Sequence, residues 1–185
     1  ATRGSKTELS DALRDALAVV QAAGYDLIIV ETSGIGQGDA EITDVSDVAM
    51  YVMTSEYGAA SQLEKIDMID FADLIVINKF ERRGSEDALR EVKKQYQRSH
   101  MRFNQDPANM PVYGTIASQF NDPGTNRLFN VLIDVLNERF DLGWQSSLEG
   151  SDEVVKQNII IPPEREQYLQ DIAKTVRDYH EYADK

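Results

Sequence analysis

A short segment near the start of the chain combines an acid, a hydroxyl and several glycines directly after an apolar run. Glu31 and Thr32 come first, and glycines follow at positions 34, 36 and 38. A carboxylate at the end of a buried strand is costly unless it is paired or holds a cation, and glycines let a ligand approach the backbone closely. The segment therefore indicates a ligand-binding loop, with a glycine-rich turn and a helix-capping acid as the alternative. Its spacing differs by one residue from the G-x-G-x-x-G loop of dinucleotide-binding proteins, which argues against that interpretation.

A second polar segment, Asn78-Lys79-Phe80-Glu81, also follows an apolar run. It resembles the N-K-x-D signature of guanine-nucleotide-binding proteins. In that signature the carboxylate accepts hydrogen bonds from the ring N–H and the exocyclic amine of guanine, a bidentate arrangement that adenine does not offer. The Asn fixes the loop, and the Lys stem covers the base. The segment predicts a guanine site, and a solvated loop is the alternative for a match this short.

A third segment, Gly114-Thr115-Ile116-Ala117-Ser118, begins within a further predicted strand and continues past its end. It matches the position at which such proteins offer a backbone N–H to the guanine carbonyl, so Ala117 and Ser118 are candidate contacts. Three segments in this order, each at the end of a predicted strand, are much harder to obtain by chance than one.

The elements that must position these segments follow from an alternation of strand and helix patterns. Apolar runs predict strands at 25–30, 48–53, 73–77 and 112–116, and helical spacing predicts helices at about 9–20, 85–98 and 126–140. Continuous apolar strands separated by helices are typical of an α/β fold with a mostly parallel sheet covered by helices. Ligands bind at the carboxyl ends of such strands, which is where all three polar segments lie.

The character of the sequence changes after residue 140. Residues 141–163 carry glycines, acids and a Pro162-Pro163 pair, which indicates a linker. A helix predicted over 164–182 has an apolar stripe, made of Tyr168, Leu169, Ile172, Val176 and Tyr179. That stripe needs a partner, and after so long a linker we favour a neighbouring domain over the α/β domain itself.

The composition limits the classes of partner. The chain has 32 acidic and 19 basic side chains, a formal net charge of −13, which opposes binding to nucleic acid or to an anionic membrane surface. It has no cysteine, which excludes disulfides and thiolate metal sites. No apolar run approaches the roughly 20 residues of a membrane-spanning helix, and we expect a cytoplasmic protein. Because the sequence begins at Ala1 without an initiator Met, we expect an internal segment of a longer polypeptide.

The pattern Glu31-Thr32-x-Gly34-x-Gly36-Gln37, followed by Asn78-Lys79, resembles the G-protein chaperones of cobalamin-dependent acyl-CoA mutases, the methylmalonyl-CoA mutase accessory GTPase family. It is most similar to the form fused within isobutyryl-CoA mutases, between a cobalamin domain and a substrate barrel. The resemblance covers residues 1–143 and implies a P-loop GTPase-like domain there. It makes residues 144–185 a linker and an amphipathic helix that lead into a mutase domain.

The resemblance implies roles for individual residues. Glu31 matches the acid that holds Mg²⁺ directly or through water, and Thr32 lies beside it in the metal shell. Gly34 corresponds to the switch glycine whose N–H reads the γ-phosphate, and Gln37 is the candidate for orienting the attacking water. The guanine contacts implied by the resemblance are Asn78, Lys79, Phe80, Glu81, Ala117 and Ser118.

The resemblance also identifies residues 56–65 as an additional switch, through which the nucleotide state is signalled to the mutase. Gln62 and Lys65 fall on its polar positions. Without the resemblance, both residues are typical of an ordinary surface helix.

The sequence departs from the family pattern in two places. Glu81 replaces the Asp of the signature and is one methylene longer, so we expect looser guanine selectivity. The chain also has no G-x-x-x-x-G-K-[S/T] motif, the P-loop that supplies N–H groups, a Lys and a Mg²⁺ ligand around the phosphates. We expect those parts to lie before Ala1.

The sequence therefore predicts a GTP-binding and GTP-hydrolysing chaperone segment of a fused adenosylcobalamin-dependent acyl-CoA mutase of the isobutyryl-CoA/n-butyryl-CoA type, which gates cofactor loading. The implied cofactors are GTP or GDP and Mg²⁺, with adenosylcobalamin in the full protein. The implied partners are the cobalamin-binding and substrate domains of the mutase, and we expect a homodimer. The alternative is a non-catalytic α/β interaction module that has lost nucleotide binding.

Overall fold

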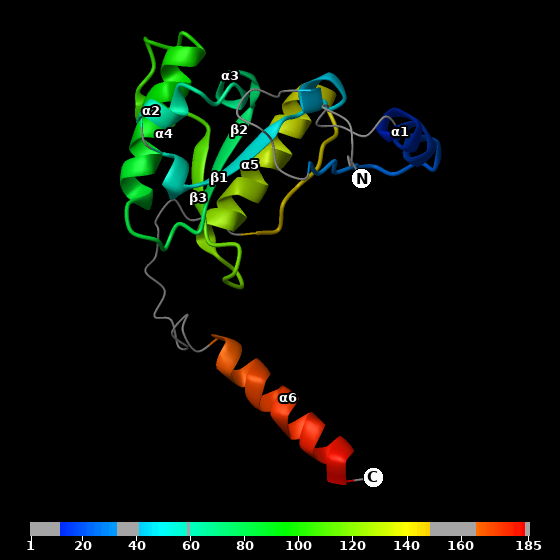
Figure 1. The fold of residues 1–185 in the computed structure, drawn as a ribbon. Coiled ribbons are helices and arrows are strands. Elements are labelled where there is room, and N and C mark those ends of the chain that lie inside the picture. Colours follow the sequence, from blue (N-terminus) through cyan, green and yellow to red (C-terminus); the bar gives the residue numbers. More distant parts are fainter. Residues whose placement is uncertain (1–11, 33–40, 59, 149–165, 184–185) are drawn as a thin grey trace. The chain divides into compact units, whose positions relative to one another are not determined.

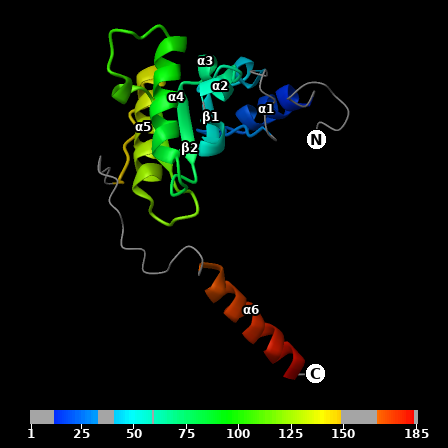
Figure 2. The same ribbon diagram turned by 60° about the vertical axis from the view of Figure 1, so that its left-hand side comes forward.

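The computed structural model describes residues 12–32, 41–58, 60–148 and 166–183. The chain divides into two units, Ala1–Asp152 and Glu153–Lys185. The described part of the second unit is the helix α6 (Glu166–Ala183), close to the range predicted from its apolar stripe (Figures 1 and 2). Among the described residues, no helix combines the length and the apolar character needed to cross a membrane.

The first unit is built on a parallel sheet, in which the described residues form three strands. These are β1 (Met50–Thr54), β2 (Leu74–Asn78) and β3 (Val112–Thr115), in the order β1-β2-β3. The four apolar residues of β2 are all buried, as is typical of a central strand covered on both faces. The register pairs Thr54 with Asn78 and Asn78 with Thr115, so the carboxyl ends of the strands lie level. The predicted α/β fold with a parallel sheet is confirmed.

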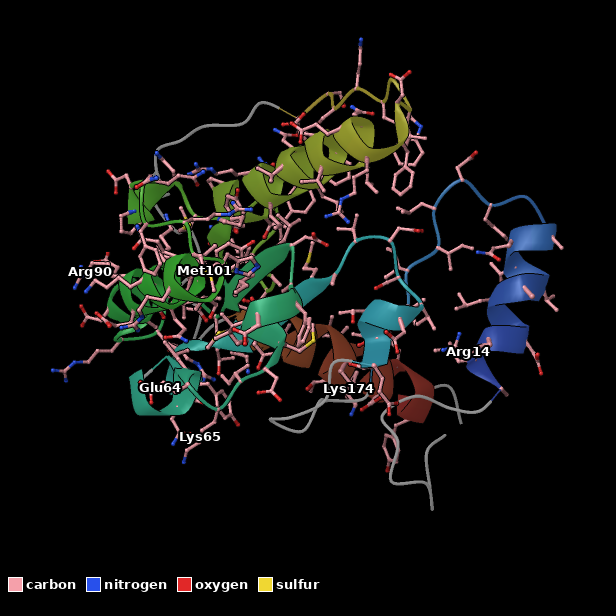
Figure 3. The ribbon with its side chains drawn as sticks, turned by 90° about the horizontal axis from the view of Figure 1, so that it is seen from above. Arg14, Glu64, Lys65, Arg90, Met101 and Lys174 are labelled. Atoms are coloured by element: carbon pink, nitrogen blue, oxygen red, sulfur yellow. The ribbon has the colours of Figure 1, made fainter. Side chains whose placement is uncertain are left out.

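Helices cover the sheet from two sides. They are α2 (Ala60–Leu63), α3 (Met68–Phe71), α4 (Ser85–Ser99) and α5 (Pro123–Phe140). Figures 1 and 3 show α4 and α5 on opposite sides of the strands, and α2 and α3 pack against α4 (Figure 2). Successive side chains of a strand face opposite sides. Ile75 and Ile77 join the core cluster that contains Val92 of α4, so Leu74 and Val76 face the other side.

The helix boundaries follow from their capping residues. Helix α5 begins at Pro123, earlier than the predicted 126, because the Asp122 side chain caps it by accepting a hydrogen bond from the N–H of Thr125. Helix α1 (Leu13–Ala22) overlaps the predicted range and ends two residues beyond it; Gly24 follows, and its φ of +78° allows the chain to turn away. The described residues of the first unit also form three single-turn 3₁₀ helices: η1 (Glu41–Asp44), η2 (Ser55–Tyr57) and η3 (Pro107–Asn109).

The predicted strand at 25–30 is wrong. Residues 25–32 form neither strand nor helix, and the side chains of Tyr25 and Ile29 are 68% and 83% exposed. A strand forms where a neighbouring strand satisfies its backbone donors and acceptors. Within the described residues the sheet ends at β1, and the apolar run has no ladder partner there. Apolar composition indicates burial, but it does not supply the partner strand.

The chain turns back along α5 after that helix ends. Asp141 takes the left-handed conformation with φ +53°. The Asn137 side chain donates to the carbonyl oxygen of Trp144 (2.7 Å) and accepts from its N–H (2.9 Å). Asn130, about two helical turns earlier, donates to the carbonyl oxygen of Leu148 at 3.3 Å. Residues 144–148, the return segment, therefore run toward the amino end of α5.

Candidate functional site

The carboxyl ends of β2 and β3 bring the second and third polar segments together. Asn78 ends β2 and is paired with Thr115, which ends β3. The Asn78 Oδ1 atom accepts hydrogen bonds from the backbone N–H of Lys79 (2.8 Å) and from that of Ala117 (3.1 Å). The Thr115 hydroxyl lies 3.4 Å from the same oxygen. One amide oxygen thus joins two loops whose contacting residues are 39 positions apart in the sequence.

Lys79 holds an unusual backbone conformation at this junction. Its φ is +56°, which costs a non-glycine residue on the order of 1 kcal/mol. The bond to Asn78 and a turn in which the N–H of Arg82 donates to the Lys79 carbonyl (3.0 Å) stabilise this conformation. The turn leaves the side chains of Lys79 and Glu81 exposed beside the end of β2. Backbone strain that presents solvated side chains at a sheet edge is typical of ligand-binding loops.

Phe80 packs within the protein and supports the junction. Its N–H donates to the Thr115 carbonyl at 3.0 Å. A Cβ atom added at Gly114 would lie 2.5 Å from the Phe80 ring, so the ring can close on β3 because residue 114 has no side chain. Among the residues expected to contact guanine, Phe80 therefore holds the two loops together alongside Asn78.

Asp122, which the sequence analysis did not identify as a site residue, closes the loop that follows β3. Its side chain is buried, with 5% of the residue exposed. Its Oδ2 atom accepts from the N–H of Ile116 (3.0 Å) and from the N–H of Thr125 (2.8 Å). Ala117 and Ser118 lie between these anchors and are exposed. The sequence did carry a signal, because Asp followed by Pro and, three residues on, Thr is a typical helix-capping pattern.

The predicted switch at 56–65 lies beside the turn that carries Glu81. The Arg82 guanidinium forms an ion pair with Glu56 at 2.5 Å, which joins the turn after β2 to η2. Gln62 is half-buried, and Lys65 is exposed and points away from the first unit (Figure 3). The partners of this ion pair are 26 residues apart, so no local pattern in the sequence indicated it.

The first polar segment is described in part. Glu31 is exposed and Thr32 is half-buried, whereas Gly34 and Gln37 lie outside the described residues. Within the described residues no three His, Cys, Asp or Glu side chains gather as a metal-ligand set. Mg²⁺ commonly takes one or two protein carboxylates and completes its shell with water and phosphate. A carboxylate next to a hydroxyl, as in Glu31-Thr32, fits that donor chemistry.

Together the loops after β2 and β3 form an edge that can recognise a flat, polar ligand. They expose an ammonium group at Lys79, a carboxylate at Glu81 and the backbone at 117–118. A carboxylate accepts two adjacent N–H donors in one plane, and the alkyl stem of a Lys can cover an apolar face. This combination fits a heterocyclic base that carries adjacent N–H donors.

The whole chain is similar to proteins of known family. The family model for the methylmalonyl-CoA mutase-associated GTPase MeaB matches residues 1–147. The fused isobutyryl-CoA mutase of Geobacillus kaustophilus is 66% identical over 185 residues, which cover 100% of this chain and 17% of that protein. The fused isobutyryl-CoA mutase of Cupriavidus metallidurans is 52% identical over 183 residues, covering 97% of this chain and 17% of that protein. A mitochondrial methylmalonic aciduria type A homolog of Caenorhabditis elegans is 30% identical over 78 residues, 42% of this chain and 20% of that protein. The chain thus spans 17% of the length of the fused mutases.

Proposed function

The chain belongs to the MeaB family of methylmalonyl-CoA mutase-associated GTPases, and from that premise we propose that it forms the guanine-binding side of a GTPase that serves an acyl-CoA mutase. The observation that carries the proposal is the junction at Asn78, where one side-chain oxygen accepts N–H groups from both loops. Preorganised loops bind a ligand with less loss of conformational entropy than loops that must order on binding.

Within this site each exposed group has a role that its chemistry supports. The Glu81 carboxylate accepts from the ring N–H and the exocyclic amine of guanine, and the Lys79 stem covers the base. The guanine carbonyl takes an N–H from the loop at 117–118. Because the N–H of Ala117 already donates to Asn78 at 3.1 Å, the carbonyl either shares that donor or uses the N–H of Ser118. Adenine has an amine where guanine has this carbonyl, so the same donors disfavour it.

The phosphate side of the proposed site uses the first polar segment. Glu31 holds Mg²⁺ directly or through water, with the Thr32 hydroxyl beside it. When bound, Mg²⁺ neutralises the charge of the phosphates. Gly34 offers its N–H to the γ-phosphate, and Gln37 orients the attacking water. The P-loop is supplied from outside these 185 residues, which contain no G-x-x-x-x-G-K-[S/T] motif.

For the whole protein we propose a fused adenosylcobalamin-dependent mutase that rearranges isobutyryl-CoA or n-butyryl-CoA. Residues 1–143 form its GTPase portion, and residues 144–185 lead into the mutase domain. GTP hydrolysis gates cofactor loading, and the switch at 56–65, with Gln62 and Lys65, signals the nucleotide state. The high identity to fused isobutyryl-CoA mutases along the whole chain supports this arrangement. We further propose a cytoplasmic homodimer.

The proposal is tested by nucleotide binding to the full-length protein. Glu81→Ala removes two charge-assisted hydrogen bonds, each contributing roughly 1.5 kcal/mol or more, so we expect GDP affinity to fall by roughly 100-fold. Glu86→Ala, which removes an exposed acid from the first turn of α4, is the matched control and should leave affinity unchanged. Equal GDP affinity in the parent and Glu81→Ala removes Glu81 from the site. A parent protein that binds no guanine nucleotide supports the non-catalytic interaction module instead.

A further inference from the structure

We propose that Asp122 is a positioning residue for guanine recognition: its buried carboxylate sets the shape of the loop at 116–121, and through that loop it determines discrimination between guanine and adenine. The inference rests on the proposed function, since it assigns the loop to the base. It extends that function by naming a residue that touches no ligand and still controls which ligand is accepted.

One oxygen of the Asp122 carboxylate accepts hydrogen bonds from donors at both ends of the loop. Besides the N–H of Ile116 (3.0 Å) and that of Thr125 (2.8 Å), Oδ2 accepts from the Thr125 hydroxyl at 2.8 Å. A carboxylate that is 5% exposed is costly to bury unless such donors surround it. Removing it leaves two partly buried N–H groups without their acceptor, which is the costly half of losing a hydrogen bond.

The last residue of β3 and the first two residues of the loop are each held by a different part of the structure. The Thr115 carbonyl accepts from Phe80 at 3.0 Å, on the turn that follows β2. The N–H of Ile116 donates to Asp122, at the start of α5, and the N–H of Ala117 donates to Asn78, at the end of β2. Asp122 is therefore the described contact that ties this stretch to α5. The direction of the next N–H group, that of Ser118, follows from these anchors.

The rest of the loop is closed in the same way. The N–H of Gln119 donates to the Ile116 carbonyl at 2.8 Å. Asn121 takes φ +56° and accepts from the Asn126 side-chain amide at 2.8 Å. The loop is thus a defined turn between two anchors, and Asp122 contacts the residue at its beginning.

The contact with Ile116 goes beyond what capping α5 requires. A helix N-cap needs one acceptor for the N–H two or three residues on, and Ser, Thr or Asn serve as well as Asp. The N–H of Ile116 belongs to the loop and not to the helix. A carboxylate at this position therefore combines a cap, which stabilises α5, with a loop anchor, which sets the geometry of 117–118.

Affinities for GDP and ADP in the full-length protein test the inference. A merely structural role changes the folded fraction and scales both affinities equally, whereas a positioning role changes their ratio. We expect Asp122→Ala to reduce the ratio of GDP to ADP affinity by about tenfold, the scale of one lost hydrogen bond to a charged group. Thr125→Val, which removes the hydroxyl donor and keeps both backbone donors, is the matched control and should keep the parent ratio.

Asp122→Asn, which keeps the volume and one carbonyl acceptor, should recover most of the ratio. Asp122→Ser keeps an N-cap acceptor for α5 on a side chain too short to hold Ile116 as well, and it serves if Asp122→Ala does not fold. A parent ratio of GDP to ADP affinity in a folded Asp122→Ala or Asp122→Ser overturns the inference. Failure of the proposed function looks different, because the parent protein itself would then show no preference for GDP over ADP.

Discussion

Gly124 offers a sharp test of how closely α5 approaches the end of β3. A Cβ atom added at this position would lie 2.1 Å from the Gly114 carbonyl oxygen, and real Cβ atoms essentially never come within 3.0 Å of a heavy atom outside their own residue and its two chain neighbours. The obstacle is backbone, so no side-chain rotation relieves it. In Gly124→Ala the start of α5 and the end of β3 must therefore separate by about 0.9 Å, the difference between these two distances. A shift of that size disrupts the Asp122 bond to Ile116, which is 3.0 Å long in the parent.

The magnitude follows from two opposing terms. Forcing a methyl group into a well-packed site costs about 1–3 kcal/mol, and a clash with backbone belongs at the upper end. Replacing Gly by Ala in a helix returns up to about 1 kcal/mol through helix propensity. The net local destabilisation is then about 2 kcal/mol, which corresponds to roughly 30-fold faster amide exchange if the region opens as a unit.

The assay is hydrogen exchange by mass spectrometry on the full-length protein, read from peptides that span β3 and the first turn of α5. Asp134→Ala changes an exposed residue of the same helix and should exchange at the parent rate. We also expect weaker GDP binding in Gly124→Ala, since the loop at 117–118 moves with its anchor. Parent-like exchange together with parent-like GDP binding in Gly124→Ala would refute the close approach and the anchoring argument built on it.

Two further predictions concern stability elsewhere in the first unit. Burial raises the pKa of Tyr51, Tyr96 and Tyr113 above the ordinary value of 10.0. The folded state therefore retains these protons more strongly than the unfolded chain does. Their contribution to the free energy of unfolding should be constant below about pH 10 and fall as the pH rises through the raised pKa values. Urea unfolding of the full-length protein from pH 9 to 11 measures this fall in the free energy of unfolding. The fall should be shallower in Tyr113→Phe. A free energy of unfolding that does not change over this pH range contradicts the raised pKa values. Asn137→Ala removes both hydrogen bonds to Trp144 and should lower the local stability of the return segment by about 1–2 kcal/mol. Hydrogen exchange should then be faster in peptides covering 144–148 and unchanged in peptides covering β2.

The junction at Asn78 was predictable because its signals are local. β2 is a continuous apolar run that ends in a polar residue, β3 begins with the apolar pair Val112-Tyr113, and carboxyl ends of parallel strands lie at one edge of a sheet. Alignment of Asn78 with Thr115 then follows from strand pairing. The bond from Ala117 to Asn78 is a consequence of that alignment, which is why residues chosen from sequence resemblance alone are adjacent in space.

What the sequence did not reveal depends on partners far along the chain. The run at 25–30 is as apolar as β2, yet β2 has a strand on each side and the described residues 25–32 have none. The ion pair of Arg82 with Glu56 joins surface charges among the many of a chain with 28% charged residues. Asp122 was recognisable as a helix cap, but its second contact, to Ile116, depends on how α5 packs on β3.

The proposed site has a base side and a phosphate side, and this division explains how a protein with a large negative charge can bind an anionic nucleotide. A formal net charge of −13 opposes an anionic ligand, and Glu81 adds a carboxylate at the place of contact. Guanine is neutral, however, and its N–H donors favour a carboxylate, so an acidic protein can select the base without repelling it. The phosphates require cations and N–H groups instead. Changes at Glu81 or Asp122 should therefore alter which nucleotide binds, whereas changes at Glu31 should alter the dependence on Mg²⁺ and leave base selectivity as it is.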